Sequence, residues 1–328
     1  MISRWAFVAA VAGSLLVGPF SAGAQPGGKP HRIGFLGNST EALEANLVGP
    51  FRDGLRELGY LEGRDLIIEY RWAEGRYDRF PALIAELVAL KVEIIVTAGT
   101  PASVAVRRAT TVIPLVMVAV GDPVGSGLVK SLARPGGTLT GLVSIAPDLE
   151  GKRLELLTEV VPKLETVAFL LNPANPFHVT SEKQARAAAE SLHLKVEFFP
   201  VRAESEFDRV FQAMSNRHPG ALVMLADRLF LHHRARIVDF SARNRLPAVY
   251  AYTELVEAGG LMSFGPSYPS MHRRAAYFVD RILKGARPAD LPMEQPSKFE
   301  LVVNLRAARG LGVVIPQHIL LRADDLIQ

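Results

Sequence analysis

The chain has 328 residues, 49% of them hydrophobic, which is enough for two ordinary domains with packed cores and excludes a disordered protein. Its formal net charge is +4, but lysines and arginines are scattered among acidic residues, so a nucleic-acid partner is not expected. The sequence contains no cysteine, which excludes disulfides, thiolate zinc sites, a cysteine nucleophile and a lipid-modified N-terminal cysteine.

Residues 1–24 have the three parts of an export signal. Arg4 supplies the positive charge, residues 5–17 form an apolar core, and Ala22-Gly23-Ala24 matches an A-x-A cleavage site. The core is shorter than the roughly 20 residues that a membrane-spanning helix needs, which disfavours an uncleaved anchor. We therefore expect a periplasmic protein cleaved after Ala24.

From residue 31 the hydrophobic pattern alternates between strands and helices. Strands are expected at residues 32–36, 66–70, 92–99, 113–120 and 139–145, and helices at 41–58, 77–90 and 102–109. Thr100 is a favourable N-cap and Pro101 a favourable first helical residue, so the strand at 92–99 should run directly into a helix. A helix N-terminus at this edge of a parallel sheet suits an anionic group, although any βα turn has the same pattern.

The same order then repeats. Strands are expected at 167–171, 196–200, 221–226 and 247–252, and helices at 150–161, 180–192, 204–217 and 230–244. The segments after Gly260 do not fit this second unit, so we expect the chain to return to the first unit there and to cross back near Phe299. The predicted fold is α/β, with two Rossmann-like lobes of parallel sheets and three interlobe crossings. Lobe one comprises residues 31–145 with 261–298, and lobe two comprises residues 146–260 with 299–328.

Several short stretches narrow the interpretation further. They are AGTPA at 98–102, GDPVG at 121–125, LARPGG at 132–137, GKRLELL at 151–157, NPANP at 172–176, VEAGGLMS at 256–263, RILKGA at 281–286 and PSKFEL at 296–301. Together with the two lobes and the export signal, they resemble the ABC transporter substrate-binding family often labelled the tryptophan/tyrosine type. The resemblance runs from about residue 31 to the C-terminus.

This resemblance implies a type I periplasmic binding protein fold and a mechanism in which the lobes close on a ligand. A small molecule, here an amino acid or a related carboxylate, binds between the lobes, and the closed form docks on an ABC permease in the inner membrane. The resemblance also implies a monomer. It gives no reason to expect a cofactor, a metal or a nucleic-acid partner.

In a parallel sheet, the loops that follow the strands lie on one edge and face the ligand. In lobe one the candidate ligand-binding residues are Asn38, Ser39, Thr97, Thr100 and Asp122. Each has a structural alternative: Asn38 and Ser39 suit a turn or an N-cap, and Asp122, between Gly121 and Pro123, suits an Asx-turn.

In lobe two the candidates are Asn172, Asp227 and Tyr252, with Asn175 close to the first. A carboxylate at Asp227 would pair with a ligand ammonium, although a salt bridge to neighbouring Arg228 is an alternative. Tyr252 would offer a stacking face, or pack in the core. The pattern predicts a zwitterionic ligand, with its carboxylate at lobe one and its amine at lobe two.

Two other classes of function remain as alternatives, a periplasmic enzyme and a ligand sensor, each acting on a small carboxylate. No GxGxxG, P-loop or GxSxG motif occurs in the context that its chemistry needs. His232 and His233 are adjacent, and adjacent residues on a helix point apart, so a shared metal site is not expected. We therefore expect a binding protein and not an enzyme.

Overall fold

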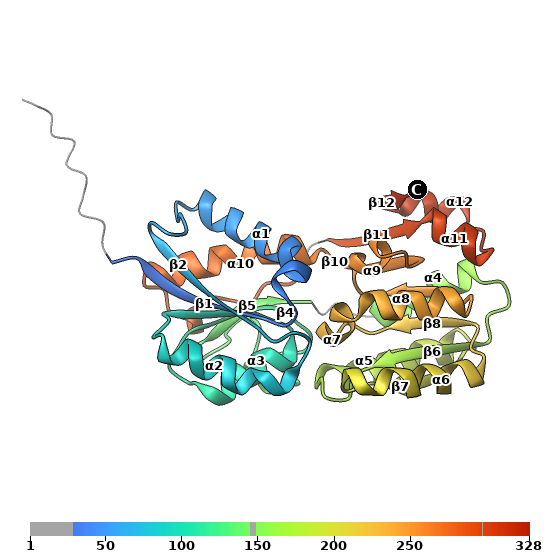
Figure 1. Ribbon diagram of the computed structural model, residues 1–328, viewed down its shortest axis with the longest axis horizontal. Helices are drawn as coiled ribbons and strands as arrows, with labels where there is room; N and C mark the ends of the chain where they lie inside the picture. The colour runs from blue at the N-terminus through green and yellow to red at the C-terminus, as the bar shows by residue number, and fades with distance from the viewer. Residues whose placement is uncertain (1–28, 145–148, 297) are drawn as a thin grey trace, which may run out of the picture.

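The computed structural model describes residues 29–144, 149–296 and 298–328, and the predicted export signal lies outside them. These residues form two α/β lobes that lie side by side (Figure 1). Each lobe contains one sheet between two layers of helices. Within the described part of the chain, no helix combines the length and the apolar character needed to cross a bilayer.

Lobe one is built on a five-stranded parallel sheet in the order β2-β1-β3-β4-β5. Its strands are β1 (His31–Gly37), β2 (Leu66–Trp72), β3 (Ile94–Ala98), β4 (Leu115–Val120) and β5 (Leu139–Val143). Its helices are α1 (Glu41–Glu57), η1 (Tyr77–Arg79), α2 (Phe80–Ala89), α3 (Thr100–Ala109), α10 (Tyr268–Leu283) and η3 (Pro288–Asp290). Helices α1 and α10 cover one face and α2 and α3 the other, so β3 and β4 are buried throughout, as their unbroken apolar sequences predict.

Lobe two has a seven-stranded sheet in the order β12-β11-β10-β9-β8-β6-β7. Its strands are β6 (Thr166–Leu171), β7 (Lys195–Pro200), β8 (Ala221–Met224), β9 (Ala248–Tyr250), β10 (Met262–Pro266), β11 (Phe299–Asn304) and β12 (Asp325–Ile327). Its helices are α4 (Leu149–Val160), α5 (Phe177–Ser191), η2 (Glu204–Glu206), α6 (Phe207–Arg217), α7 (Arg228–His232), α8 (Arg234–Arg243), α9 (Thr253–Glu257), α11 (Leu305–Leu311) and α12 (Gln317–Arg322). All pairs are parallel except β10 with β11.

The second crossing lies later than the sequence analysis placed it. The prediction returned the chain to lobe one after Gly260, but β10 pairs with β9 in the sheet of lobe two. The reason is that β9, α9 and β10 form one more strand-helix-strand unit, a connection that keeps consecutive parallel strands in one sheet. The short helix α9 was not predicted. The chain leaves lobe two only between β10 and α10, which packs against α1.

Candidate functional site

A cavity lies between the two lobes, at the carboxyl ends of their parallel strands. Both lobes contribute to its walls. The lining residues are Gly99, Thr100, Pro101, Ala119, Gly121, Ser144, Asn175, Phe177, Ala226, Asp227, Arg228, Tyr252 and Tyr268. This is the position at which open α/β sheets bind their ligands.

Direct hydrogen bonds between the lobes hold the mouth of this cavity closed. The Tyr77 hydroxyl of lobe one donates to Asp227 Oδ1 of lobe two at 2.6 Å. Ser39 Oγ and His232 Nδ1 are 2.6 Å apart. Between α1 and α9, Asn46 Nδ2 donates to Glu254 Oε1 at 2.8 Å. The protein is therefore described in its closed arrangement.

The lobe-one wall is the turn from β3 into α3. Gly99, and not Thr100, is the N-cap of α3, and its φ of 83° lies in the left-handed region. The prediction of Thr100 as N-cap was therefore wrong by one residue, because this tight turn needs a backbone conformation that glycine adopts at little cost. Thr100 is the first helical residue, and its Oγ1 accepts a hydrogen bond of 3.1 Å from the amide of Gly121. The side chain thus joins α3 to the loop after β4.

The end of β4 has an irregular backbone where it borders the cavity. Ala119 has a φ of 53°, and the pairing of β4 with β5 shifts register between Met117 and Val120. A non-glycine residue in this region costs of the order of 1–3 kcal/mol, and such strain is concentrated at functional sites. The hydroxyl of Ser144, at the end of β5, donates to the carbonyl of Ala119 at 3.3 Å and so supports the bulge.

Asp227 is the centre of the lobe-two wall, and its carboxylate has several donors. Oδ1 accepts from the Tyr77 hydroxyl, from the amide of Leu229 at 3.0 Å and from Asn172 Nδ2 at 3.2 Å. Oδ2 accepts from Asn175 Nδ2 at 2.8 Å. Asp227 therefore caps α7, orients two asparagines and bonds to lobe one, with acceptor capacity left on Oδ2.

Arg228 is the main residue of the site that the sequence analysis missed. Its side chain is only 3% exposed, and its guanidinium lies over the rings of Tyr252 and Tyr268, at 5.4 and 5.0 Å from their centroids. Its two terminal nitrogens have no hydrogen-bond partner among residues 29–144, 149–296 and 298–328. The alternative prediction, a salt bridge to Asp227, is not found, since neither terminal nitrogen makes a hydrogen bond to that carboxylate. A second charged residue directly after Asp227, with apolar residues on both sides of the pair, was the signal that could have identified it.

The charge of Arg228, a residue of lobe two, acts on ionisable groups of lobe one. Burial raises the pKa of Glu44 in lobe one, and the guanidinium partly opposes that rise. Burial raises the pKa of Tyr268 to about 12, again against the effect of Arg228, so this phenol stays neutral. Burial and then the positive charge of Arg228 lower the pKa of His272 to about 3. The guanidinium is therefore the dominant positive charge of the cavity at neutral pH.

The predicted residues fall into two groups. Thr100, Asp227 and Tyr252 line the cavity, as does Asn175. The others do not line it: Asn38 donates to the carbonyl of Ala98, Ser39 contacts His232, Thr97 donates to the carbonyl of Leu36, Asp122 accepts from Gly125 and Thr180, and Asn172 donates to Asp227. These five side chains shape the strand ends and the contact between the lobes.

The two adjacent histidines make different contacts. The His232 and His233 rings lie edge to face, with centroids 4.7 Å apart, and His232 is bonded to Ser39 across the cleft. In the described ranges, no three His, Cys, Asp or Glu side chains converge in a way that would hold a metal ion.

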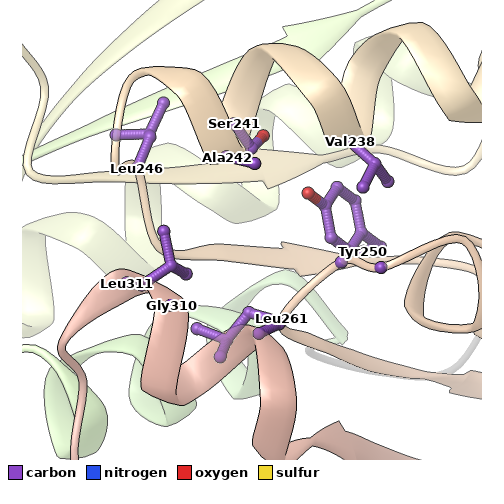
Figure 2. A pocket seen from close by; sticks show the side chains of 11 residues that line it. Val238, Ser241, Ala242, Leu246, Tyr250, Leu261, Gly310 and Leu311 are labelled. Carbon is purple, nitrogen blue, oxygen red and sulfur yellow. The ribbon is translucent and has the colours of Figure 1, made fainter.

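A second pocket lies in lobe two, between α8, β9 and α11 (Figure 2). Val238, Leu246, Leu261 and Leu311 give it apolar walls, and the Tyr250 ring lies beneath α8 with its hydroxyl toward Ser241. No charged side chain lines this pocket, and lobe one contributes none of its lining residues. It therefore lacks the groups that would recognise a charged ligand or close around one.

The topology and the cavity together define the class of this protein. Two α/β lobes, three crossings between them and a closable cavity at the strand ends are the features of a type I periplasmic binding protein. Over residues 39–327 the sequence matches one family, described as ABC transporter substrate binding protein. The chain belongs to this family.

Similar proteins support the same assignment. A tyrosine-binding protein of Clostridioides difficile (strain R20291) is 26% identical over 271 residues, which are 80% of this chain and 75% of that protein. A Streptococcus pneumoniae ABC domain, solved in complex with L-Trp, is 28% identical, with a TM-score of 0.85 over 91% of this chain and 100% of that one. A domain protein from Vibrio cholerae is 26% identical, with the same TM-score and coverage. The first of these proteins is thus a tyrosine-binding protein, and the second was solved with L-Trp bound.

Proposed function

We propose that this protein captures an amino acid or a related small carboxylate between its lobes and delivers it to an ABC permease in the inner membrane. The observation that carries the proposal is the interlobe cavity itself, which both lobes line at their strand ends and which the Tyr77–Asp227 bond closes. The tyrosine-binding and L-Trp-bound relatives favour an amino acid over other small molecules.

The residues that line the cavity have the chemistry to recognise an amino acid with an apolar or aromatic side chain. Phe177, Tyr252 and Tyr268 offer ring surfaces, and aromatic pairs add about 0.5–1.5 kcal/mol beyond their buried area. The remaining acceptor capacity of Asp227 Oδ2 suits a ligand ammonium. On the opposite wall, Thr100 fixes the turn from β3 into α3, which faces the ligand. We further propose that the export signal is cleaved after Ala24 and that the mature protein works as a periplasmic monomer.

A thermal-shift screen of amino acids and organic acids tests the proposal. A ligand that binds only the folded state at 100 times its Kd stabilises the protein by about 2.7 kcal/mol, which is a measurable rise in Tm. The expected result is a rise in Tm with at least one amino acid, and calorimetry then gives its Kd. A screen in which no amino acid or organic acid raises Tm contradicts the proposal.

A pair of variants tests the site. Asp227→Asn removes the charge that faces the ligand, and we expect affinity to fall by about 10- to 100-fold, the effect of a lost charge-assisted hydrogen bond. Asp122→Asn is the matched control, because Asp122 also lies after a strand and accepts a bond from the other lobe, but does not line the cavity. Equal losses in the two variants would contradict a ligand contact at Asp227.

A further inference from the structure

We propose that Arg228 is the anchor for the ligand carboxylate, so that the cavity accepts only ligands with a free carboxylate. The inference rests on the proposed function and adds the chemical class that the site requires. It also moves the carboxylate from the lobe-one position expected from the sequence to a guanidinium contributed by lobe two.

The first argument is the cost of burying this charge. An ion removed from water is destabilising by several kcal/mol unless a partner compensates it. Arg228 is 3% exposed, and within the described ranges its terminal nitrogens contact no acceptor. A buried cation without an acceptor is what a site for an anion requires, because the incoming carboxylate then supplies the missing hydrogen bonds.

The second argument is the orientation of the guanidinium. Tyr252 comes from the loop after β9 and Tyr268 from the start of α10, and both rings lie against Arg228. The centroids of the two rings are 4.6 Å apart, so both rings lie on the same side of the guanidinium and leave its other side for an acceptor. A planar carboxylate can accept two parallel hydrogen bonds from a guanidinium. The two rings therefore position Arg228 as well as line the cavity.

The third argument is the position of Arg228 against lobe one. A Cβ built on Gly99 would lie 3.4 Å from Arg228 Cγ, so the side chain lies directly at the N-terminus of the ten-residue helix α3. The first turn of a helix has amides without intrahelical acceptors and the positive end of its dipole. Guanidinium and helix terminus thus converge from opposite lobes, and one carboxylate between them would favour the closed form.

The acidic residues nearby do not take the place of a ligand. Glu44 Oε1 accepts from the amides of Asn38 and Ser39, at 2.8 and 2.6 Å. Glu254 Oε1 accepts from Asn46 across the cleft. Both carboxylates attract the positive charge of Arg228, but the hydrogen bonds that they accept come from these other donors. The guanidinium edge is left for a ligand.

The test compares matched ligands on the wild type and on Arg228→Met. The probes are the standard amino acids and simple organic acids, each beside its amide, with tryptophan, tryptophanamide and tryptamine as one set. The wild type should bind carboxylates and reject their amides and amines. In Arg228→Met the affinity for the carboxylate should fall at least about thirtyfold, the loss expected for a buried charged hydrogen bond. The affinity of Arg228→Lys for the carboxylate should lie between those of the wild type and Arg228→Met, because lysine keeps the charge but lacks the paired N–H groups.

A stability measurement separates this role from a structural one. Because Arg228 has no acceptor to lose among the described residues, unliganded Arg228→Met should melt no lower than the wild type, whereas a structural arginine would lower Tm. If amides or amines bind as tightly as the carboxylates, or if Arg228→Met keeps wild-type affinity, the anchor is overturned while the proposed function stands. If nothing in the panel binds, both proposals fail.

Discussion

Two buried arginines of the chain, Arg153 and Arg228, have opposite surroundings. Arg153, on α4, is 1% exposed, donates two hydrogen bonds to Glu150 and one to the carbonyl of Phe264. Arg228, at the start of α7, is 3% exposed and has no such acceptors in the part of the chain that the structure describes. Equal burial therefore conceals two different kinds of site.

The difference shows how this fold separates stability from ligand recognition. The Arg153–Glu150 pair lies where the chain enters lobe two and bonds to β10 just before the chain leaves it again, so it fixes two of the crossings. Its charges are compensated within the protein. Arg228 lies at the cavity between the lobes, where compensation is left to a ligand. The first arginine holds the lobe together, and the second makes closure depend on what is bound.

The largest effect is expected from breaking the paired arginine. Arg153→Met leaves Glu150 buried without its partner, and such a loss destabilises by about 3–5 kcal/mol. Urea denaturation measures it as a fall in the free energy of unfolding. The double variant Glu150→Leu with Arg153→Met should recover most of the loss, since it removes both charges. A single variant as stable as the wild type would show that the pair contributes nothing.

A smaller effect is expected from the bond that links Asp227, next to Arg228, to lobe one. Tyr77→Phe removes the hydroxyl that donates to Asp227 at 2.6 Å, and a hydrogen bond to a charged group contributes about 1.5–3 kcal/mol. Because the bond exists only when the lobes are closed, the loss should appear as weaker ligand binding in calorimetry. Tyr60→Phe is the control, since Tyr60 donates to Asp280 within lobe one at 3.1 Å. Equal effects of the two variants on affinity would contradict a role in closure.

The surroundings of Arg228 also predict how stability changes with pH. Burial first, and Arg228 second, lower the pKa of His272 from 6.5 to about 3, so the folded protein binds this proton less readily than the unfolded chain. Stability is therefore full above pH 6.5 and falls as the pH drops toward 3, with a loss of about 2 kcal/mol by pH 5. Denaturation at several pH values measures this slope. His272→Gln should flatten it, and a slope unchanged by that substitution would contradict the prediction.

The sequence predicted the fold because the signals for it are local. Unbroken apolar runs such as β3 and β4 identify buried parallel strands, and the glycine and proline after β3 mark the turn into α3. The crossing after Gly260 was misplaced because a five-residue strand followed by a long helix has the same pattern in either lobe. Only the pairing of β10 with β9 assigns it.

The candidate site was predicted only in part, for a related reason. Thr100, Asp227 and Tyr252 follow strands and line the cavity. Asn38 and Asp122 also follow strands, but their side chains bond to other parts of the protein and do not line the cavity. Whether a side chain at a strand end points to the ligand depends on partners that are distant in sequence. Arg228 is the extreme case: its importance lies in having no acceptor within the part of the chain that the structure describes, which a linear pattern does not show.

The smallest expected effect is a change in the pKa of His272, which compares the charge of Arg228 with that of a surface arginine. If the charge of Arg228 is uncompensated, its removal in Arg228→Met should raise the pKa of His272 in the unliganded protein, by a fraction of the total shift because burial contributes more. Proton NMR of the imidazole measures it. Arg273→Met is the matched control, because Arg273 is the sequence neighbour of His272. Its side chain is half exposed and paired with Glu57, so solvent and this partner screen its charge. In this variant the pKa of His272 should stay unchanged. A ligand carboxylate on the wild type should raise the His272 pKa in the same direction as Arg228→Met, because it neutralises the same guanidinium. Equal shifts from the two arginine variants would mean that Arg228 is screened like a surface charge, and the contrast between the buried arginines would then lose its electrostatic basis.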